Sequence, residues 1–118
     1  MTEYEQEWTT ERGLPPCCRL RVAMTKRRGT PVRFVVQLEY WHAGRWLEVA
    51  RSDHDVDGPT YRNVEVVGLH LDLYHPEKGQ VAKRTLSRPL PAKEAMGRAE
   101  RYLRANAQNY VTRFERWL

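Results

Sequence analysis

The sequence has few cysteines, and the two present are the neighbours Cys17 and Cys18. Adjacent cysteines cannot link distant segments of a chain, which argues against a disulfide framework. The chain also has no CxxC pair, which argues against a zinc ribbon. The fold must therefore be held by its own core, and a length of 118 residues is enough for one domain.

Long apolar runs are also missing. The longest fall far short of the ~20 residues that cross a bilayer, and the mean hydropathy is −0.76. The first residues, MTEYEQEWTTER, are acidic and lack the basic and then apolar segments of a secretory signal. We therefore expect a cytoplasmic protein that does not interact with membranes.

The familiar catalytic and cofactor motifs are absent as well. The sequence shows no phosphate-binding loop, nucleophile elbow, dinucleotide fingerprint or helix-turn-helix pattern. We therefore predict no cofactor and no metal site, and these absences leave open whether the protein is an enzyme.

Alternating apolar and polar residues dominate the stretch between positions 32 and 86. The segments VRFVVQLEYW, WLEVARSD and GLHLDLY alternate with the period of two that is typical of half-buried strands. Ala43-Gly44 and Pro76–Gly79 are predicted turns, because glycine adopts the positive φ angles that tight turns need. The resulting hairpins predict these cross-strand pairs: Trp41–Trp46, Tyr40–Leu47, Glu39–Glu48, Leu38–Val49, Tyr74–Val81, Asp72–Lys83 and His70–Thr85.

This register gives the sheet one apolar face and one polar face, because side chains alternate along a strand. The polar face would carry Gln37, Glu39, Trp41, Trp46, Glu48, His70, Asp72 and Tyr74. Residues 18–25 alternate too and would form another strand, with 26–31 as the following turn. Residues 61–67 are predicted as a short strand.

After residue 91 the apolar period changes to that of a helix. Met96, Ala99, Leu103, Tyr110, Phe114 and Trp117 recur at spacings of three, four and seven. We predict an α+β fold in which a four- or five-stranded antiparallel meander is packed on one face by a long C-terminal helix. Residues 1–16 would be an acidic N-terminal arm and 17–118 a single domain, with the sheet in 17–88 and the helix in 92–118.

Basic residues are concentrated in one part of the chain. The net charge is +5, and residues 17–33 contain six basic side chains and no acidic one. Such a block is typical of proteins that bind polyanions. We predict nucleic-acid binding, to RNA rather than DNA, through Arg19, Arg21, Lys26, Arg27, Arg28 and Arg84.

The candidate catalytic residues are His70, Asp72 and Tyr74, which point to one side of a strand. Histidine titrates near neutrality and can act as a general base or acid. A carboxylate can orient it, and a tyrosine can donate a hydrogen bond to phosphate. This set would suffice for metal-independent RNA cleavage. Alternatively, Asp72 and Lys83 form an ordinary cross-strand ion pair.

Three further features have a structural and a functional interpretation. Asp53, Asp55 and Asp57 before Gly58 match the opening of a calcium-binding loop, but the twelfth position is Val64 instead of glutamate, which favours a solvated turn. Glu39 opposite Glu48 needs an offsetting charge from Arg19 or Arg21, or else a cation held together with His70 and Asp72. Trp41 and Trp46 would form an aromatic pair that serves packing or base stacking.

The order of the segments EYW, turn and W, followed by an aspartate-histidine loop, GLHLDLY and a terminal helix, resembles a family of small uncharacterised prokaryotic domains. It is also loosely similar to TumE-type toxins of toxin–antitoxin modules. The resemblance covers roughly residues 33–115 and implies a compact basic α+β domain that acts on RNA and has a cognate antitoxin as partner. No site residue is carried over from it.

The sequence thus predicts a small RNA-binding protein. If it is catalytic, we expect a toxin-like ribonuclease. The alternative is a non-catalytic interaction module that docks a protein partner through the open face of its sheet.

Overall fold

The computed structural model describes residues 3–118, which form one sheet and three helical segments. The strands are β1 (Gln6–Thr10), β2 (Cys18–Arg27), β3 (Thr30–His42), β4 (Arg45–Asp55), β5 (His70–His75) and β6 (Gly79–Thr85). A 3₁₀ helix, η1 (Thr60–Arg62), and the short helix α1 (Val64–Val67) connect β4 to β5, and α2 (Ala92–Glu115) ends the chain.

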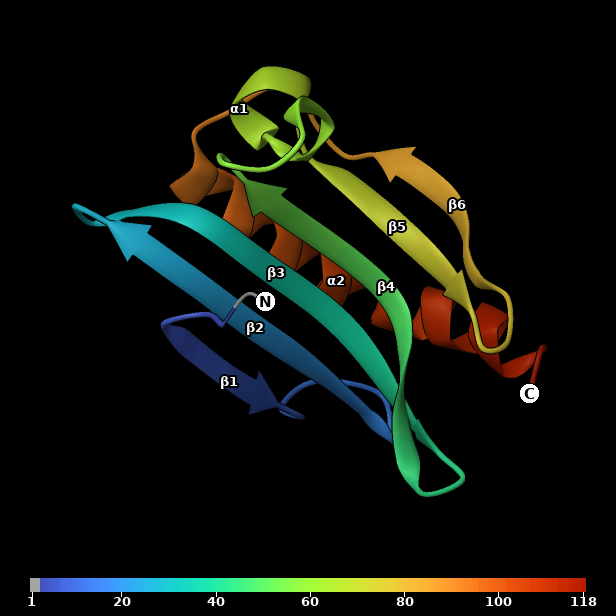
Figure 1. The fold of residues 1–118 in the computed structure, drawn as a ribbon. Helices are drawn as coiled ribbons and strands as arrows, with labels where there is room; N and C mark the ends of the chain where they lie inside the picture. The colour runs from blue at the N-terminus through green and yellow to red at the C-terminus, as the bar shows by residue number, and fades with distance from the viewer. Residues whose placement is uncertain (1–2) are drawn as a thin grey trace.

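The sheet is an antiparallel meander in which every strand pairs with its neighbours in sequence, in the order β1-β2-β3-β4-β5-β6. Helix α2 crosses one face, and among the described residues no long helix covers the opposite face (Figure 1). This confirms the predicted α+β class with its C-terminal helix. The predicted strand count was wrong, because the sheet has six strands: Gln6–Thr10, in the segment expected to be an arm, pairs with β2 as an edge strand.

The core lies between α2 and the covered face of the sheet. Phe34, Val36 and Leu38 of β3 are fully buried there, as are Leu71 of β5 and Leu103 of α2. The helix presents a stripe of small residues, Ala92, Ala95, Ala99 and Ala107, so that its backbone can approach the sheet closely. None of the helices in the described part of the chain is long and apolar enough to cross a membrane.

Two hairpins close through two-residue turns with positive φ at both positions. In the β3–β4 turn, Ala43 has φ 53° and Gly44 has φ 82°, as the sequence predicts for this place. In the β2–β3 turn, Arg28 has φ 54° and Gly29 has φ 79°. The second turn was predicted to span 26–31 and is shorter, because Arg27 still pairs with Thr30. Such primed turns match the twist of the strands.

Two β-bulges change the predicted register. Glu39 pairs with Glu48 as expected, but Leu38 pairs with Ala50 instead of Val49. Val49 is the extra residue of this bulge. Because of it, the consecutive residues Val49 and Ala50 are both buried, whereas in a regular strand they would point to opposite faces of the sheet. The β5–β6 hairpin keeps the predicted pairs Asp72–Lys83 and His70–Thr85, but Tyr74 pairs with Gln80 instead of Val81.

The connector between β4 and β5 is helical, which corrects the strand predicted for 61–67. The Asn63 side chain caps α1 by accepting a hydrogen bond from the Glu65 backbone N–H at 3.0 Å. His54 Nδ1 accepts the Val64 N–H at 3.1 Å. These polar contacts favour a helical turn in a valine-rich segment whose composition alone is typical of strands.

Candidate functional site

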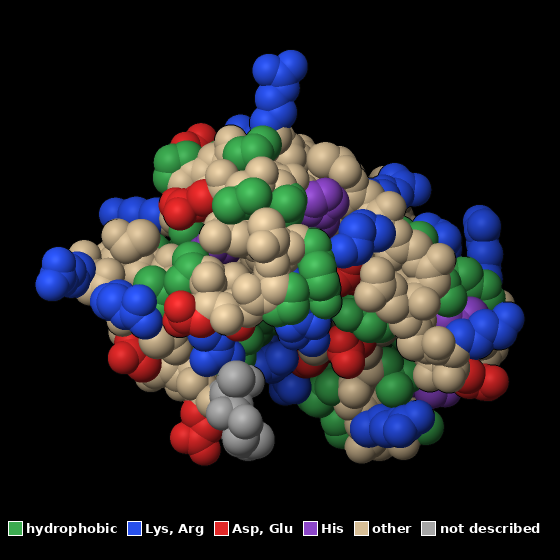
Figure 2. All heavy atoms as spheres, turned by 45° about the horizontal axis from the view of Figure 1, so that its top comes forward, with side chains coloured by type: hydrophobic (Ala, Val, Ile, Leu, Met, Phe, Trp, Pro, Cys, Tyr) green, Lys and Arg blue, Asp and Glu red, His purple; other side chains and the backbone are tan. Residues whose placement is uncertain are grey.

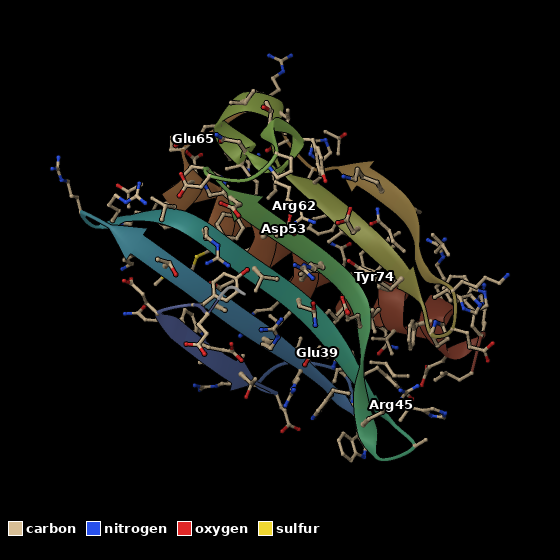
Figure 3. All side chains as sticks on the ribbon, in the orientation of Figure 1. Glu39, Arg45, Asp53, Arg62, Glu65 and Tyr74 are labelled. Atoms are coloured by element: carbon tan, nitrogen blue, oxygen red, sulfur yellow. The ribbon has the colours of Figure 1, made fainter. Side chains whose placement is uncertain are left out.

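The open face of the sheet carries the polar side chains on which the functional predictions depend. Glu39, Asp53 and Tyr74 lie along this face on β3, β4 and β5 (Figure 3). Arg62, from the connector, lies over the end of the face near Asp53, whereas Tyr74 lies toward the other end of the strands (Figure 3). Basic and acidic side chains are interspersed on the surface of this part of the molecule (Figure 2).

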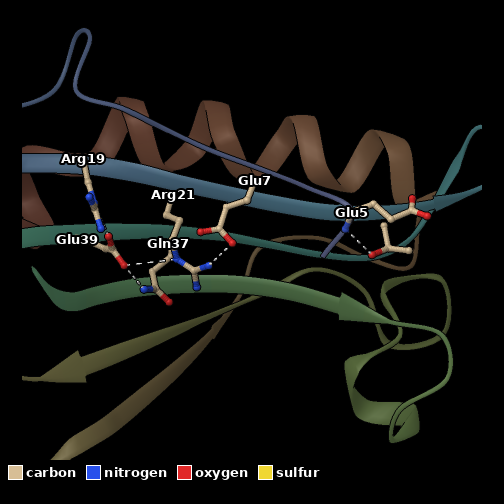
Figure 4. A network of polar contacts seen from close by, with 7 residues as sticks. Glu5, Glu7, Arg19, Arg21, Gln37 and Glu39 are labelled. Carbon is tan, nitrogen blue, oxygen red and sulfur yellow. Dashed lines mark hydrogen bonds and ion pairs between the residues drawn. The ribbon is translucent and has the colours of Figure 1, made fainter. Parts of the chain in front are cut away.

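Glu39 is the centre of a polar network on the open face (Figure 4). Its side chain is only 7% exposed, and its Oε1 lies 2.7 Å from Arg19 Nε. Its Oε2 accepts a hydrogen bond from Gln37 Nε2 at 2.5 Å and lies 3.6 Å from Arg21 Nε. Arg21 also pairs with Glu7 of β1 at 3.4 Å. Arg19 and Arg21 therefore offset the Glu39 charge, as the sequence predicts.

Because of this network, Arg19 and Arg21 are less available to bind phosphate than the sequence suggested. The side chains of Arg19 and Arg21 are each about a quarter exposed and already hold a carboxylate. Arg19 additionally stacks on Trp46, with its Cζ atom 4.1 Å from the ring centroid. A phosphate would have to compete with these contacts, so the two arginines are poor candidates for a free anion site.

The other predicted nucleic-acid contacts lie elsewhere. Lys26, Arg27 and Arg28 are exposed at the β2–β3 turn, where Arg27 lies 3.5 Å from Asp57. Arg84 pairs in register with Leu71, a core residue, and its Cζ lies 5.9 Å from the ring of Tyr110 in α2. It therefore extends on the helix side of the sheet. The six predicted basic residues occupy three separate places and form no continuous surface.

Each aspartate of the calcium-like motif has an arginine neighbour. Asp53 lies 3.4 Å from Arg51, Asp55 lies 3.7 Å from Arg33, and Asp57 faces Arg27. Asp53 and Asp55 belong to strand β4, so the motif is no continuous loop. Across residues 3–118, no group of three or more histidine, cysteine, aspartate or glutamate side chains is placed to hold a metal ion.

A polar pocket lies where the connector meets the end of the β5–β6 hairpin. We call it the β5–β6 pocket; it has a volume of about 120 Å³ and is lined by Asp53, Tyr61, Arg62, Gly68, His70, Asp72, Gln80 and Lys83. The sequence predicted His70 and Asp72 as site residues and Lys83 as the partner of Asp72. The connector folds back and adds Tyr61 and Arg62 to them.

Some side chains of this pocket form hydrogen bonds or ion pairs with one another, and others do not. Asp72 Oδ1 accepts a hydrogen bond from Gln80 Nε2 at 3.1 Å and lies 3.6 Å from Lys83 Nζ. Arg62 and Lys83 approach the exposed Tyr61 ring, at 5.9 and 5.7 Å from its centroid. Within residues 3–118, the Arg62 guanidinium has no carboxylate within 4.0 Å, and no side chain hydrogen-bonds to the His70 imidazole.

Tyr74 lies apart from the other two predicted catalytic residues. It lines a neighbouring groove together with Trp46, Glu48 and His75. Burial raises the pKa of its hydroxyl, and nearby Arg51 partly offsets that rise. The hydroxyl therefore stays protonated at neutral pH and can donate a hydrogen bond, but it does so outside the pocket that holds His70.

The sequence did not indicate Tyr61 and Arg62 as site residues. They were assigned to a strand, and no motif marks them, because they reach His70 only through the helical turn of the connector. The aromatic pair was predicted correctly: the Trp41 and Trp46 rings lie edge to face at 5.3 Å. Trp41 is 45% exposed at the end of the β3–β4 hairpin.

One family model matches the chain, over residues 1–118, and its description is "Domain of unknown function (DUF7718)". This confirms the expected similarity to a family of small uncharacterised domains. No curated protein and no solved structure matches the chain.

Proposed function

The chain belongs to the DUF7718 family, and on the geometry of the β5–β6 pocket we propose that it binds RNA and cleaves it without a metal ion. The observation that carries this proposal is the convergence of His70, Arg62 and Lys83 in one polar pocket beside the exposed Tyr61 ring.

The pocket offers the parts that a ribonucleotide needs. Arg62 can hold a phosphate through two parallel hydrogen bonds, and Lys83 adds a second positive charge. Tyr61 is 59% exposed and presents a ring on which an unpaired base can stack. Asp72 positions Lys83, because it contacts both Lys83 and Gln80 across the hairpin.

The proposed reaction uses the 2′-hydroxyl of the substrate as nucleophile. His70 accepts its proton as a general base. The 2′-oxygen then bonds to the adjacent phosphorus, and the bond to the 5′-oxygen breaks, which leaves a 2′,3′-cyclic phosphate. Arg62 and Lys83 stabilise the negative charge that develops on the phosphate oxygens. Water protonates the leaving 5′-oxygen, because His70 is the one imidazole that lines this pocket among the described residues. The hydroxide that this leaves takes the proton from His70, which restores the base.

The test is incubation of the purified protein with a labelled single-stranded RNA, with and without EDTA. Cleavage should survive EDTA and fall by about 10²-fold or more in His70→Ala, the loss typical of a missing general base. His42→Ala is the matched control, because His42 is exposed near the β3–β4 turn, away from the pocket. Equal cleavage by the two variants would contradict the assignment of His70.

Binding is tested separately with a non-cleavable 2′-deoxy analogue. The double variant Arg62→Gln/Lys83→Gln should weaken binding at least tenfold, whereas Arg98→Gln/Arg101→Gln on the exposed side of α2 removes the same charge and should have little effect. If binding falls equally in both, net charge and not the pocket attracts RNA. If RNA is neither bound nor cleaved, the nucleic-acid function is wrong.

The resemblance to TumE-type toxins suggests a cellular role for such an activity. Induced expression should then arrest growth, and His70→Ala should abolish the arrest. Co-expression with a cognate antitoxin protein should restore growth. The absence of any growth effect by an RNA-cleaving protein would overturn the toxin role and leave the enzymatic one.

A second candidate function is the docking of a protein partner on the open face. Two observations favour it: Arg19, Arg21 and Arg51 are already paired with carboxylates, and Trp41 is exposed at the end of the β3–β4 hairpin. An aromatic interface of this kind responds weakly to salt, whereas phosphate-dominated binding weakens steeply. Trp41→Ala should then abolish capture of the partner and leave RNA binding unchanged.

A further inference from the structure

A second cationic pocket lies on the helix side of the sheet, where β6 passes α2. It has a volume of about 180 Å³ and is lined by Arg84, Tyr102, Asn106, Asn109, Tyr110 and Arg113. Five of these residues come from α2, at spacings that place them on one side of the helix. Arg84 reaches them from β6, because its register partner Leu71 also points to that side.

The charge of this pocket is not compensated. No carboxylate lines it, and within residues 3–118 neither Arg84 nor Arg113 has a carboxylate oxygen within 4.0 Å. The guanidinium groups rest instead on aromatic rings: Arg84 Cζ is 5.9 Å from the Tyr110 centroid, and Arg113 Cζ is 5.4 Å from that of Trp117. These stacking contacts leave the N–H groups of both arginines able to donate.

The neutral groups of the pocket supply further donors. The hydroxyls of Tyr102 and Tyr110 lie 2.7 Å apart, so one donates to the other and the second proton is free. Asn106 donates one amide hydrogen to the Tyr102 carbonyl oxygen at 2.9 Å and keeps another. Burial and the hydrogen bond to Tyr102 raise the pKa of Tyr110 to about 12, so its hydroxyl remains a neutral donor.

We propose that this pocket binds a phosphate group, free or carried on a small ester, between the guanidinium groups of Arg84 and Arg113. A tetrahedral oxyanion with several terminal oxygens suits two planar cationic donors from different elements and the tyrosine hydroxyls of the same pocket. The site is distinct from the β5–β6 pocket, because Arg84 and Lys83 are consecutive in β6 and point to opposite faces of the sheet.

Titration calorimetry of the full chain with inorganic phosphate, at constant ionic strength, tests the proposal. We expect saturable binding in which this pocket holds one phosphate per chain, apart from any phosphate bound in the β5–β6 pocket. Arg84→Gln/Arg113→Gln should weaken it at least tenfold and Tyr102→Phe by a smaller factor. The control Arg98→Gln/Arg101→Gln removes two exposed arginines from the same helix and should bind as the wild type does. No saturable binding, or an equal loss in both double variants, would overturn the site.

A measurement on the wild-type protein keeps the test independent of variant folding. The side-chain Nε–H resonances of Arg84 and Arg113 should shift on phosphate addition, with the same dissociation constant as the calorimetry, whereas those of Arg98 and Arg101 should not. Unchanged Arg84 and Arg113 resonances at saturating phosphate would refute the proposal.

A third arm separates free phosphate from an ester. Adenosine 5′-monophosphate should compete with phosphate if the site accepts an ester, and adenosine should not compete in either case. Competition by adenosine would show that the phosphate group is not what is recognised and would refute the proposal. These outcomes do not depend on RNA cleavage, since Arg62, His70 and Lys83 are unchanged in every variant.

Discussion

At the scale of single residues, Gly68 fixes the position of the connector. It has φ 86°, and a Cβ atom built there would lie 2.2 Å from the Ser87 carbonyl oxygen. We therefore predict that Gly68→Ala lowers the free energy of unfolding by about 3 kcal/mol or more, because the new methyl group would force the backbone apart in addition to straining φ. Urea denaturation followed by circular dichroism measures this change.

The matched control for this prediction is Gly79→Ala. Gly79 has a similar φ of 76°, but a Cβ atom there would meet nothing within 4 Å. Its substitution should cost only the strain of a positive φ, about 1 kcal/mol. If the two variants lose the same stability, the close approach of Gly68 to Ser87 is not what constrains the connector.

His54 is the buried residue from which we expect a pH dependence of stability. Its side chain packs against Phe34, its Nδ1 accepts the Val64 N–H, and its Nε2 has no hydrogen-bond partner among residues 3–118. Burial lowers the pKa of His54 below its ordinary value of 6.5. Above pH 6.5 the imidazole is neutral in both the folded and the unfolded chain, so its full contribution is present there.

As the pH falls below 6.5, the unfolded chain takes up a proton more readily than the folded one, and the free energy of unfolding decreases. The slope is at most about 1.4 kcal/mol per pH unit for one group. Urea midpoints at pH 7.5 and 5.5 should show the decrease. It should be smaller in His54→Leu, which cannot titrate, and retained in His70→Gln. A dependence unchanged by His54→Leu would contradict the prediction.

At the scale of elements, we predict that the edges of the sheet open before its centre. Strand β1 is mostly exposed and pairs only with β2, and β6 pairs only with β5. Strand β3 has partners on both sides and several fully buried side chains. Amide hydrogens exchange fastest where local opening costs least.

Hydrogen exchange followed by mass spectrometry measures this order. Peptides from β1 and β6 should exchange at least tenfold faster than those from β3, and α2, which is packed on β3, should resemble β3. The wild-type chain is sufficient, and β2 is the internal control, since it is paired on both sides. Protection of β1 equal to that of β3 would show that the edge strand opens only with the whole domain.

At the scale of the whole molecule, the distribution of charge limits how RNA, the proposed ligand, could be held. The net charge is +5, yet many of the basic side chains face carboxylates, and the predicted contacts lie in three places. If the β5–β6 pocket binds single-stranded RNA through two or three phosphates, log K should fall with log salt with a slope of about −1.5 to −2. Fluorescence anisotropy over a salt series measures it.

The alternative outcome is equally definite. If all six predicted basic residues contacted phosphate together, the slope would be about −4. A slope of that size would contradict the pocket and would favour a surface that follows Arg19, Arg21 and the β2–β3 turn. A slope near zero would argue against phosphate contacts altogether and in favour of docking through the open face.

The sequence by itself determined the class of the fold and the content of its core. The period of two in Phe34, Val36 and Leu38, and the change of period after residue 91, reflect which face of each element is buried, and both were predicted correctly. The partnership of Glu39 with Arg19 and Arg21 also followed from the sequence, because like charges opposite each other need a counter-charge.

Only the tertiary structure decided where the candidate sites are. The bulges at Val49 and Val81 depend on how the strands pack, and the helical connector depends on contacts from His54 and Asn63. The periodicity of the local sequence therefore predicts neither the bulges nor the helical connector. The same packing brings Arg62 to His70, sends Tyr74 to another groove and places Arg84 beside Arg113. Pattern indicates which side of an element is buried, whereas the position of residues distant in sequence is set by how the elements pack.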